Sequence, residues 1–581
     1  MPESRPNHLT WRLIVLTCLV GMAMVALLVR LAMIQIVNHE RYVEEAAATH
    51  LGVADLPAPR GAILDASGFP LATSEDTWDV YIDRFLWGQD PAQAADAAKG
   101  LAAALGSDEQ ALIELGMDGG AGDVVVQRQL PYEAGIELES RDLWGIRLLP
   151  SARRVYPEGG LASSIVGFVG LEGRGLWGVE ADFDGVLQGR PGLIGSERDA
   201  LGRPISFGGR TERDPVPGGD VTLTIDRFIQ SIAEQRLKEA VGRYNARGGS
   251  IVVMDPHTGA ILAMASVPSV GQSGIDLDDP QLLDEVRNRA IADLYEPGSV
   301  IKTLTTASAL DLGRVTPETT YVDTGEVQIG DAIIKNWDFS ANGPTNVREY
   351  LQKSLNTGSV WLSQLVGAKD FYRYLQAFGL GEPTHVGLSG EAEGLIRLPS
   401  DQDWYPVDLA TNSYGQGFAA TPIQVLTAVN VFANGGRLMR PYIVSQVANQ
   451  DSVRHFEPVE VRRPVSASTA ETMGRLMYDV VEGVEYHGAR VPGYNVAGKT
   501  GTTLVSIPTG YDLDGTIASF AGFLPYEQPR VSILVKIDQP SGGLNLGGQV
   551  AAPVFAGVAS DIMKYLRVPA SRPGELQTAA Q

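Results

Sequence analysis

The chain contains one serine that stands three residues before a lysine, and this spacing can support nucleophilic chemistry. The pair is Ser299 and Lys302, in the segment Glu296-Pro297-Gly298-Ser299-Val300-Ile301-Lys302, and none of the other eight lysines has a serine at this spacing. Residues three apart on a helix share a face, so the hydroxyl and the amine can meet. A serine hydroxyl becomes a strong nucleophile when a neighbouring base removes its proton. The pair therefore predicts a serine that attacks a carbonyl group, with lysine as its base.

A lysine acts as a base only if its pKa falls far below the ordinary value. A fall of about three units from about 10.4 corresponds to roughly 4 kcal/mol. Lys302 opens an apolar, helix-like run that continues to Leu310, so burial would disfavour its charged form. A second positive charge would act in the same direction, and Lys499 is the candidate. The sequence thus predicts a neutral Lys302 beside a charged Lys499.

Lys499 belongs to a second candidate segment, Asn495–Thr502, which is rich in small residues. Such a strand would let the backbone of a substrate run alongside it as an added β partner. The ammonium of Lys499 and the hydroxyls of Thr500 and Thr502 suit a carboxylate at the end of a substrate. We therefore expect Lys499-Thr500-Gly501-Thr502 to bind an acidic substrate terminus.

A Ser-x-Asn pattern between these two segments occurs twice. Ser354-Leu355-Asn356 joins two amphipathic segments, whereas Ser340-Ala341-Asn342 lies in a polar loop containing glycine and proline. The first placement favours Ser354 as a proton relay and Asn356 as a ligand for a peptide amide.

The elements that must position these residues are predicted from Gly249 onward. Two apolar strands, residues 250–254 and 260–265, are joined by the turn signal Asp255-Pro256-His257-Thr258-Gly259. Residues 517–523 and 531–537 are strand-like, and residues 550–566 form an amphipathic helix pattern. A sheet built from both ends of a domain, with helices between, predicts an α/β (α+β) domain over residues 246–568.

The N-terminal part of the chain predicts a membrane anchor. Residues 13–29 carry no charge, and the apolar character resumes after Arg30 through Val37. A helix needs about 20 residues to cross the hydrocarbon core, which residues 13–37 supply if Arg30 extends outward. The alternative is a cleaved signal peptide, but Leu28-Val29-Arg30-Leu31 is a poor cleavage site and Ala46-Ala47-Ala48 lies too far downstream. The alternating charges of residues 38–50 predict a solvated helical extension.

A separate unit is predicted to begin near residue 52, after which residues 60–245 show short strands and turns. An Ala-rich helix is expected over residues 91–105. The segment Gly173-Arg174-Gly175-Leu176-Trp177-Gly178 matches the dinucleotide fingerprint Gly-x-Gly-x-x-Gly. Because it lacks a buried strand before it and is followed by acidic, turn-rich sequence, we reject a dinucleotide site.

Composition excludes further classes of function. The 581 residues carry a net charge of −23, which would repel the phosphate backbone of a nucleic acid. The single cysteine, Cys18, lies in the apolar run, so neither an intrachain disulfide nor a cysteine-based zinc site is expected. The seven histidines show no metal-ligand spacing, and the sequence predicts neither a metal nor a cofactor.

In this order, Ser-x-x-Lys, Ser-x-Asn and Lys-Thr-Gly resemble the signature of serine enzymes that are acylated by penicillins. The chain resembles class B penicillin-binding proteins, which are peptidoglycan D,D-transpeptidases, over about residues 13–565. Further similar segments are Arg60–Asp65 with Gly68 and Leu71-Ala72, Arg154–Pro157, Gly167–Gly170, Gly178–Glu180 and Leu223–Asp226. The resemblance implies a β-lactamase-like transpeptidase domain with a central antiparallel sheet flanked by helices. A β-rich, elongated pedestal domain (38–245) and one transmembrane helix (13–37) would precede it, with a cytoplasmic tail (1–12) and a C-terminal tail (569–581) at the ends.

The resemblance also implies roles for the candidate residues. Ser299 would be the acylated nucleophile, Lys302 its base, and Ser354 and Asn356 partners from the second motif. Lys499, Thr500 and Thr502 would hold the terminal carboxylate, with Gly501 between them, and the N–H groups of Ser299 and Thr502 would form the oxyanion hole. The substrates would be peptidoglycan stem peptides and β-lactams. The expected partners are the cytoplasmic membrane, a membrane glycosyltransferase and other wall-synthesis proteins, with the N-terminus inside and the catalytic domain outside.

Single features of the sequence favour one subgroup of the family and argue against three alternative functions. The segments Tyr295–Ser299 and Tyr414–Phe418 resemble division-type rather than elongation-type members, although Leu355 departs from the serine usual in that subgroup. A β-lactam sensor would need a cytoplasmic partner domain, which 12 residues cannot supply. A β-lactamase would not need a pedestal of about 200 residues. A catalytically silent scaffold would not need intact motifs.

Overall fold

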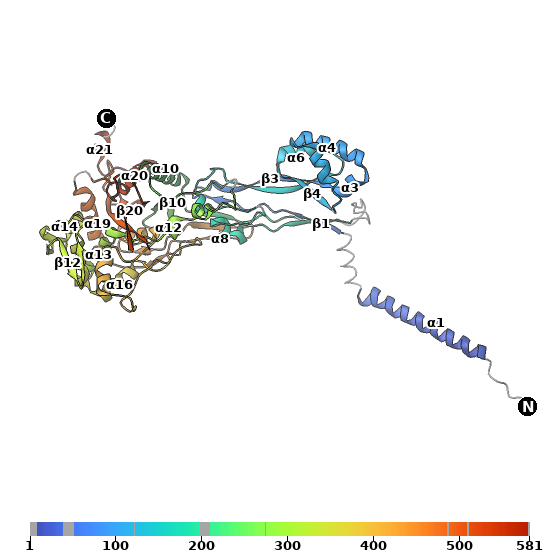
Figure 1. Ribbon diagram of the computed structural model, residues 1–581, viewed down its shortest axis with the longest axis horizontal. Helices are drawn as coiled ribbons and strands as arrows, with labels where there is room; N and C mark the ends of the chain where they lie inside the picture. Colours follow the sequence, from blue (N-terminus) through green and yellow to red (C-terminus); the bar gives the residue numbers. More distant parts are fainter. Residues whose placement is uncertain are drawn as a thin grey trace, which may run out of the picture. The chain divides into compact units, whose positions relative to one another are not determined.

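The computed structural model describes residues 8–38, 51–120, 122–170, 172–197, 210–272, 275–484, 487–507 and 510–578 (Figure 1). The chain divides into two compact units, both built from separate stretches of sequence. The first comprises Met1–Pro59, Asp76–Ala152 and Gly189–Pro217, and the second comprises Arg60–Glu75, Arg153–Gln188 and Gly218–Gln581. The helix predicted over residues 38–50 lies outside the described residues except for Asn38.

The N-terminal apolar segment is helical. Helix α1 (His8–Ala32) continues into a π-helical turn, Met33–Val37, so the segment predicted over residues 13–37 is helical throughout and begins earlier, at His8. By length and composition, Trp11–Ala32 can cross a membrane, and none of this stretch is buried against the rest of the chain. An apolar helix without a protein partner needs a non-aqueous environment, which fits a single-pass anchor.

The first unit combines short sheets with a small helical core. Its further elements are β1 (Leu51–Leu56), α3 (Arg84–Gln89), α4 (Pro91–Leu105), α5 (Glu109–Gly116), β4 (Asp123–Pro131), α6 (Tyr132–Ser140), β6 (Gly192–Glu197) and β7 (Arg210–Arg213). Strands β3 (Pro70–Asp83) and β5 (Ile146–Val155) have residues in both units. Strands β1, β6 and β7 form an antiparallel sheet, and β4 pairs antiparallel with the Thr77–Asp83 part of β3.

The predicted Ala-rich helix is confirmed as α4. Asp90 caps it by accepting hydrogen bonds from the N–H groups of Ala92 and Gln93, Pro91 fits the first turn, and Gly106 ends it at φ +67°. Its alanines pack with Trp87 and Ile82 in one buried cluster. The unit is more helical than predicted, because α3, α5 and α6 are too short to produce a clear helical period in the sequence.

The second unit holds all the candidate site residues. Its elements up to the middle of the unit are β2 (Ile63–Leu64), α7 (Ser163–Val166), α8 (Gly178–Asp182), α9 (Asp184–Leu187), β8 (Asp220–Leu223), α10 (Arg227–Arg243), β9 (Gly248–Met254), β10 (Ile261–Val267), α11 (Leu282–Val286), α12 (Arg289–Ala292), η2 (Gly298–Ile301), α13 (Lys302–Asp311), β11 (Thr320–Asp323), β12 (Glu326–Ile329), β13 (Ala332–Lys335), β14 (Gly343–Asn346), α14 (Val347–Lys353), α15 (Asn356–Val366) and α16 (Ala368–Ala377). The remaining elements are α17 (Pro406–Asn412), α18 (Pro422–Ala433), β15 (Leu438–Met439), β16 (Val444–Ala448), β17 (Val453–His455), β18 (Glu460–Arg462), α19 (Ala467–Glu482), β19 (Ala497–Ile507), β20 (Gly510–Leu524), β21 (Val531–Asp538), α20 (Ala551–Tyr565) and α21 (Pro573–Thr578).

The core of this unit is a five-stranded sheet in the order β10-β9-β21-β20-β19. Every neighbouring pair is antiparallel, as expected, and the predicted strands and turn at residues 250–265, 517–523 and 531–537 are confirmed. Alternate residues of β9 serve opposite faces: Ile251 and Val253 join one buried cluster, and Val252 and Met254 join the other.

Helices cover both faces of the sheet, and α10 and α20, which share one face, lie side by side in Figure 1. Helix α20 confirms the helix predicted over residues 550–566, and with α10 it buries one face, while α13 and α18 supply side chains to the core of the other. Helix α10 lies before residue 246, the predicted start of the α/β domain. Its buried residues nevertheless pack with those of β9 and β10 in the core of that domain.

The glycine-rich segment 173–178 belongs to a buried charge network and not to a dinucleotide site. Glu180 is fully buried and accepts hydrogen bonds from Arg60 Nε and Arg154 Nε, both at 2.6 Å. A Cβ on Gly175 would lie 1.9 Å from the carbonyl oxygen of Glu180, so only glycine fits there. These segments, far apart in the sequence, therefore meet around one carboxylate.

Candidate active site

Ser299 lies in the short 3₁₀ helix η2, directly before α13. Gly298 has φ +59°, and its N–H group donates to the carbonyl oxygen of Gly415. A Cβ on Gly298 would lie 2.7 Å from the Thr503 side chain, so the glycine allows η2 to approach strand β19. Ser299 is half-buried, and its hydroxyl makes no hydrogen bond with any residue in the described part of the chain.

Lys302 is the first residue of α13 and is fully buried. Its Nζ donates to the carbonyl oxygen of Ser354 at 2.6 Å and to Asn356 Oδ1 at 2.8 Å, and lies 3.4 Å from Ser354 Oγ. The amine is therefore held against the second motif by short contacts.

Ser354 and Asn356 occupy the junction between two helices. Ser354 ends α14 in the left-handed conformation, at φ +56°, and Asn356 begins α15. The amide of Asn356 also donates to the carbonyl oxygen of Lys335 at 2.8 Å, which fixes the orientation of its side chain. The alternative motif lies elsewhere: Ser340 bonds to Asp338, and Asn342 bonds to Asp323.

Lys499 lies on β19, the outer strand of the central sheet, and is 1% exposed. Its Nζ donates to Ser354 Oγ at 3.0 Å and lies 3.2 Å from the Thr500 hydroxyl. The hydroxyl of Ser354 thus stands between the two buried lysines.

The two amines perturb one another. Burial lowers the pKa of Lys302 well below its ordinary range, and the positive charge of Lys499 lowers it further. Burial alone lowers the pKa of Lys499 to about 7. Two positive charges this close repel one another, so protonation of both amines costs free energy. The neutral form is therefore favoured at Lys302.

These residues border a cavity of about 710 Å³, which is large enough for a peptide segment. Of the candidates, its lining includes Ser299, Ser354, Asn356, Lys499, Thr500 and Thr502. Lys302 and Gly501 are buried and are not part of the lining. A Cβ on Gly501 would lie 2.6 Å from the Pro297 carbonyl oxygen, so Gly501 lets β19 contact the segment that carries Ser299.

Several residues of the lining were not predicted from the sequence. Trp337 and Phe339 are exposed on its rim, and Tyr414 lies in a segment noted only for its family resemblance. His487, one of the seven histidines without metal-ligand spacing, also lines the cavity. No spacing signal identifies these positions, because they reach the cavity from loops and from the end of an unrelated helix.

His487 is neutral in this environment. Burial, together with the charges of Lys499 and Arg490, lowers the pKa of its imidazole to about 4. Its Nδ1 accepts a hydrogen bond from the N–H group of Ala489, so the proton of the neutral ring is on Nε2. Within the described residues, no group of three or more His, Cys, Asp or Glu side chains could hold a metal ion.

Two family models match the chain. The penicillin-binding protein transpeptidase domain matches residues 249–564, and the penicillin-binding protein dimerisation domain matches residues 55–223. The peptidoglycan D,D-transpeptidase FtsI of Escherichia coli K12 is 31% identical over 569 residues, covering 97% of this chain and 94% of the relative. Stage V sporulation protein D of Bacillus subtilis is 31% identical over 516 residues, covering 88% and 78%.

Solved structures share the fold. A peptidoglycan synthetase from Bifidobacterium adolescentis aligns with a TM-score of 0.73 at 27% identity, over 90% of this chain and 98% of that chain. Penicillin binding protein 3 from Mycobacterium tuberculosis, in complex with aztreonam, aligns with a TM-score of 0.68 at 27% identity, over 90% and 99%.

Proposed function

The chain belongs to the penicillin-binding protein family, and from this premise we propose that it is a peptidoglycan D,D-transpeptidase acting through an acyl-enzyme on Ser299. The observation that carries the proposal is the arrangement of Ser354 between two buried lysines, beside Ser299 on one peptide-sized cavity. Such an arrangement supplies a base, a proton relay and a cation without a metal.

In the acylation step, Ser299 Oγ attacks the carbonyl carbon of the D-Ala-D-Ala peptide bond. Neutral Lys302 takes the hydroxyl proton as the new C–O bond forms. The N–H groups of Ser299 and Thr502 stabilise the oxyanion of the tetrahedral intermediate. When the C–N bond breaks, protonated Lys302 passes its proton through the Ser354 hydroxyl to the departing amine, and D-Ala leaves.

Lys499, Thr500 and Thr502 bind the terminal carboxylate of the donor peptide. A charged Lys499 and two hydroxyls on one strand suit that group, with Gly501 keeping the strand close to Ser299. Asn356 binds an amide of the peptide backbone. The hydroxyl of Thr502 already accepts a hydrogen bond from the N–H group of Gly547 at 2.9 Å, which leaves its own proton free to donate.

The second half of the reaction transfers the acyl group. An amine of a neighbouring stem peptide attacks the ester carbonyl and gives up a proton to neutral Lys302. Lys302 returns this proton to Ser299 Oγ as the C–O bond breaks, and a new peptide bond remains. A β-lactam would acylate Ser299 in the same way, but it would remain attached because its leaving group stays tethered.

The proposed topology places residues 1–12 in the cytoplasm, residues 13–37 across the inner membrane and the rest outside it. We assign residues 38–245 to a pedestal of the dimerisation type, residues 246–568 to the transpeptidase domain and residues 569–581 to a tail. The family matches at 55–223 and 249–564 support this division. The substrate lies outside the membrane, which sets the orientation.

The chain is proposed to act in division rather than elongation, because the segments Tyr295–Ser299 and Tyr414–Phe418 resemble division-type members of the family. A membrane glycosyltransferase and other wall-synthesis proteins are its proposed partners, because a cross-linking enzyme needs newly polymerised strands.

To test this function, the full chain is incubated in detergent with a fluorescent penicillin. The covalent adduct is then measured by mass spectrometry. We expect one stable adduct on the wild type and none on Ser299→Ala. Ser340→Ala, which changes the serine of the alternative motif, should be labelled like the wild type. Rapid release of hydrolysed drug would favour a β-lactamase, and an unlabelled wild type would favour a catalytically silent scaffold.

A further inference from the structure

A second cavity, of about 440 Å³, lies at one end of the central sheet and shares no lining residue with the catalytic cavity. The start of β9 and the ends of β19 and β21 contribute to it, through Gly248, Val505 and Asp538. The segment from α12 to Leu294 closes another side. Its volume falls in the range of small-ligand sites.

The lining of this cavity is cationic. Arg247, Arg287, Arg289 and Lys536 face two carboxylates, Asp293 and Asp538. One more carboxylate, Asp284, pairs with Arg289 at 2.7 Å from outside the lining, so the group still carries an excess of positive charge. This excess stands out in a chain whose net charge is −23.

Several of these donors are not used within the protein. Arg289 is 8% exposed, yet its Nε makes no hydrogen bond, and the buried Nε of Arg287 also has no partner. Arg247 is exposed, and its guanidinium makes no hydrogen bond or ion pair with any residue of the described ranges. The two Nε atoms are closed off from solvent, so the guanidinium of Arg247 is the unpaired donor that a ligand in the cavity can reach.

From these observations we infer that the cavity binds a small oxyanionic ligand, through a phosphate or carboxylate group. A guanidinium fork donates two parallel hydrogen bonds to either group, and Arg247 has its fork free. The other two arginines of the lining already pair with Asp284 and Asp293. The ligand would pair with the free guanidinium of Arg247 and neutralise the excess charge. Arg247, as the exposed and unpaired member, would meet the ligand first.

The site also adjoins the catalytic segment. Lys536 Nζ lies 5.5 Å from the centre of the Tyr295 ring, and Tyr295 stands four residues before Ser299. The ligand would therefore contact residues continuous with the nucleophile without entering the catalytic cavity.

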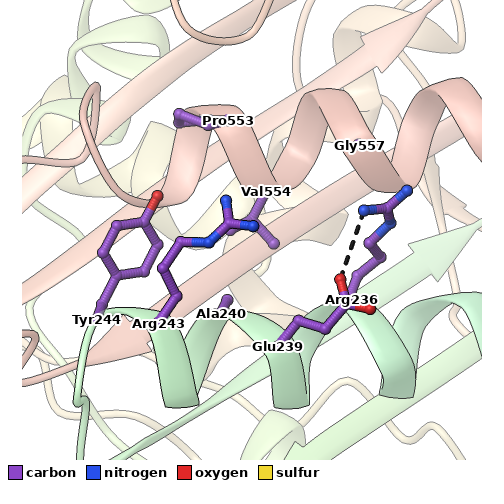
Figure 2. Close-up of a pocket in the computed structure, with 8 residues that line it drawn as sticks. All are labelled: Arg236, Glu239, Ala240, Arg243, Tyr244, Pro553, Val554 and Gly557. Atoms are coloured by element: carbon purple, nitrogen blue, oxygen red, sulfur yellow. Dashed lines mark hydrogen bonds and ion pairs between the residues drawn. The ribbon is translucent and has the colours of Figure 1, made fainter.

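A groove between α10 and α20 provides the matched control. Figure 2 shows Arg236 and Arg243 there, with Glu239 paired to Arg236. This groove encloses only about 50 Å³, room for little more than water. Arg243 is exposed and carries the same charge as Arg247, but it lies on helix α10, outside the proposed site.

The test is calorimetric titration of the full chain in detergent with inorganic phosphate, and separately with citrate, at constant ionic strength set with chloride. We expect saturable binding of at least one of the two anions, weakened about tenfold or more by Arg247→Gln because one charged hydrogen-bond donor is lost. Arg243→Gln should bind as the wild type does. Tighter binding of phosphate would identify phosphate esters as the ligand class, and tighter binding of citrate would identify carboxylates.

The inference is overturned if neither anion binds, or if Arg243→Gln weakens binding as much as Arg247→Gln does, since that would indicate unspecific attraction. Penicillin labelling of both variants should equal that of the wild type and reports a folded catalytic domain. The outcome is thus independent of the proposed catalytic function.

Discussion

The hydroxyl of Ser354 connects the two buried amines of the site. Lys499 donates to it at 3.0 Å, and Lys302 lies 3.4 Å away. Because a hydroxyl both accepts and donates, it can pass a proton between a base and a leaving group. Its left-handed backbone, at the end of α14, points this side chain to a place that no regular helix residue could reach.

Removing this relay tests the role of the second motif. We expect Ser354→Ala to lower the rate of penicillin acylation about 10²-fold or more, because proton transfer is lost. Stopped-flow labelling measures the rate. Ser340→Ala is the control, because Ser340 bonds to Asp338 and not to either lysine. Equal rates in the two variants would contradict a relay at Ser354.

The charges of the two lysines predict a bell-shaped pH profile for acylation. As pH rises, Lys302 loses its proton first, because its pKa is well below the ordinary value, and the rate increases as the base forms. Above about pH 7, Lys499 loses its proton and can no longer attract a carboxylate, so the rate falls. Acylation rates measured across the pH range test both limbs.

His487 supplies the control for this profile. Its pKa of about 4 leaves it neutral around pH 7, so His487→Gln should keep the alkaline limb in place. If that limb disappears in His487→Gln, the assignment to Lys499 is wrong.

At the scale of elements, the site depends on a close approach between strand β19 and the short helix η2. Gly298 and Gly501 make the approach possible, since a Cβ on either would lie within 2.7 Å of an atom of the facing segment. Ser299 and the strand that carries Lys499 and Thr502 are therefore positioned by the same contact. This explains why two glycines belong to the motifs although neither provides a reactive group.

Gly501→Ala tests this contact. The added methyl would lie 2.4 Å from Ser519 Oγ and 2.6 Å from the Pro297 carbonyl oxygen, so the strand must shift. A displacement of about 1 Å can reduce a rate about 10²-fold, and we expect a loss of acylation of that order.

Gly242→Ala is the matched control for this substitution. Gly242 lies on α10, and an added Cβ would meet nothing within 4 Å. This variant should be acylated normally and be more stable by up to about 1 kcal/mol, as helix propensity predicts. Normal acylation of Gly501→Ala as well would show that the approach of β19 is not needed.

At the scale of the whole molecule, catalysis and membrane attachment are separate properties of the chain. The site is confined to the second unit, whereas Trp11–Ala32 has no buried residues. Removing the apolar helix therefore deletes no core contact.

A chain that begins at residue 51 should be soluble without detergent and should label with penicillin at a rate within about twofold of the full chain. Gel filtration and the same labelling assay measure both properties. Aggregation of the shortened chain, or loss of labelling, would show that the N-terminal segment also supports the fold.

Local sequence patterns predicted a large part of this protein. The apolar run, the Ala-rich helix with its caps and the strands of the central sheet each produce a signal within a few residues, because periodicity and end chemistry are local. The short helices of the first unit did not produce such a signal, since six to nine residues show too little helical period.

The sequence by itself determined which residues could do the chemistry, namely Ser299 with Lys302, the Ser-x-Asn pattern and Lys499 to Thr502, because their types and spacings are properties of the chain. Only the tertiary structure decided that Ser354 rather than Ser340 stands between the lysines, and that His487 joins the same cavity. It also decided that both amines are buried, which is what lowers their pKa values. The physical reason is that burial and distance depend on segments hundreds of residues apart, which no local pattern contains.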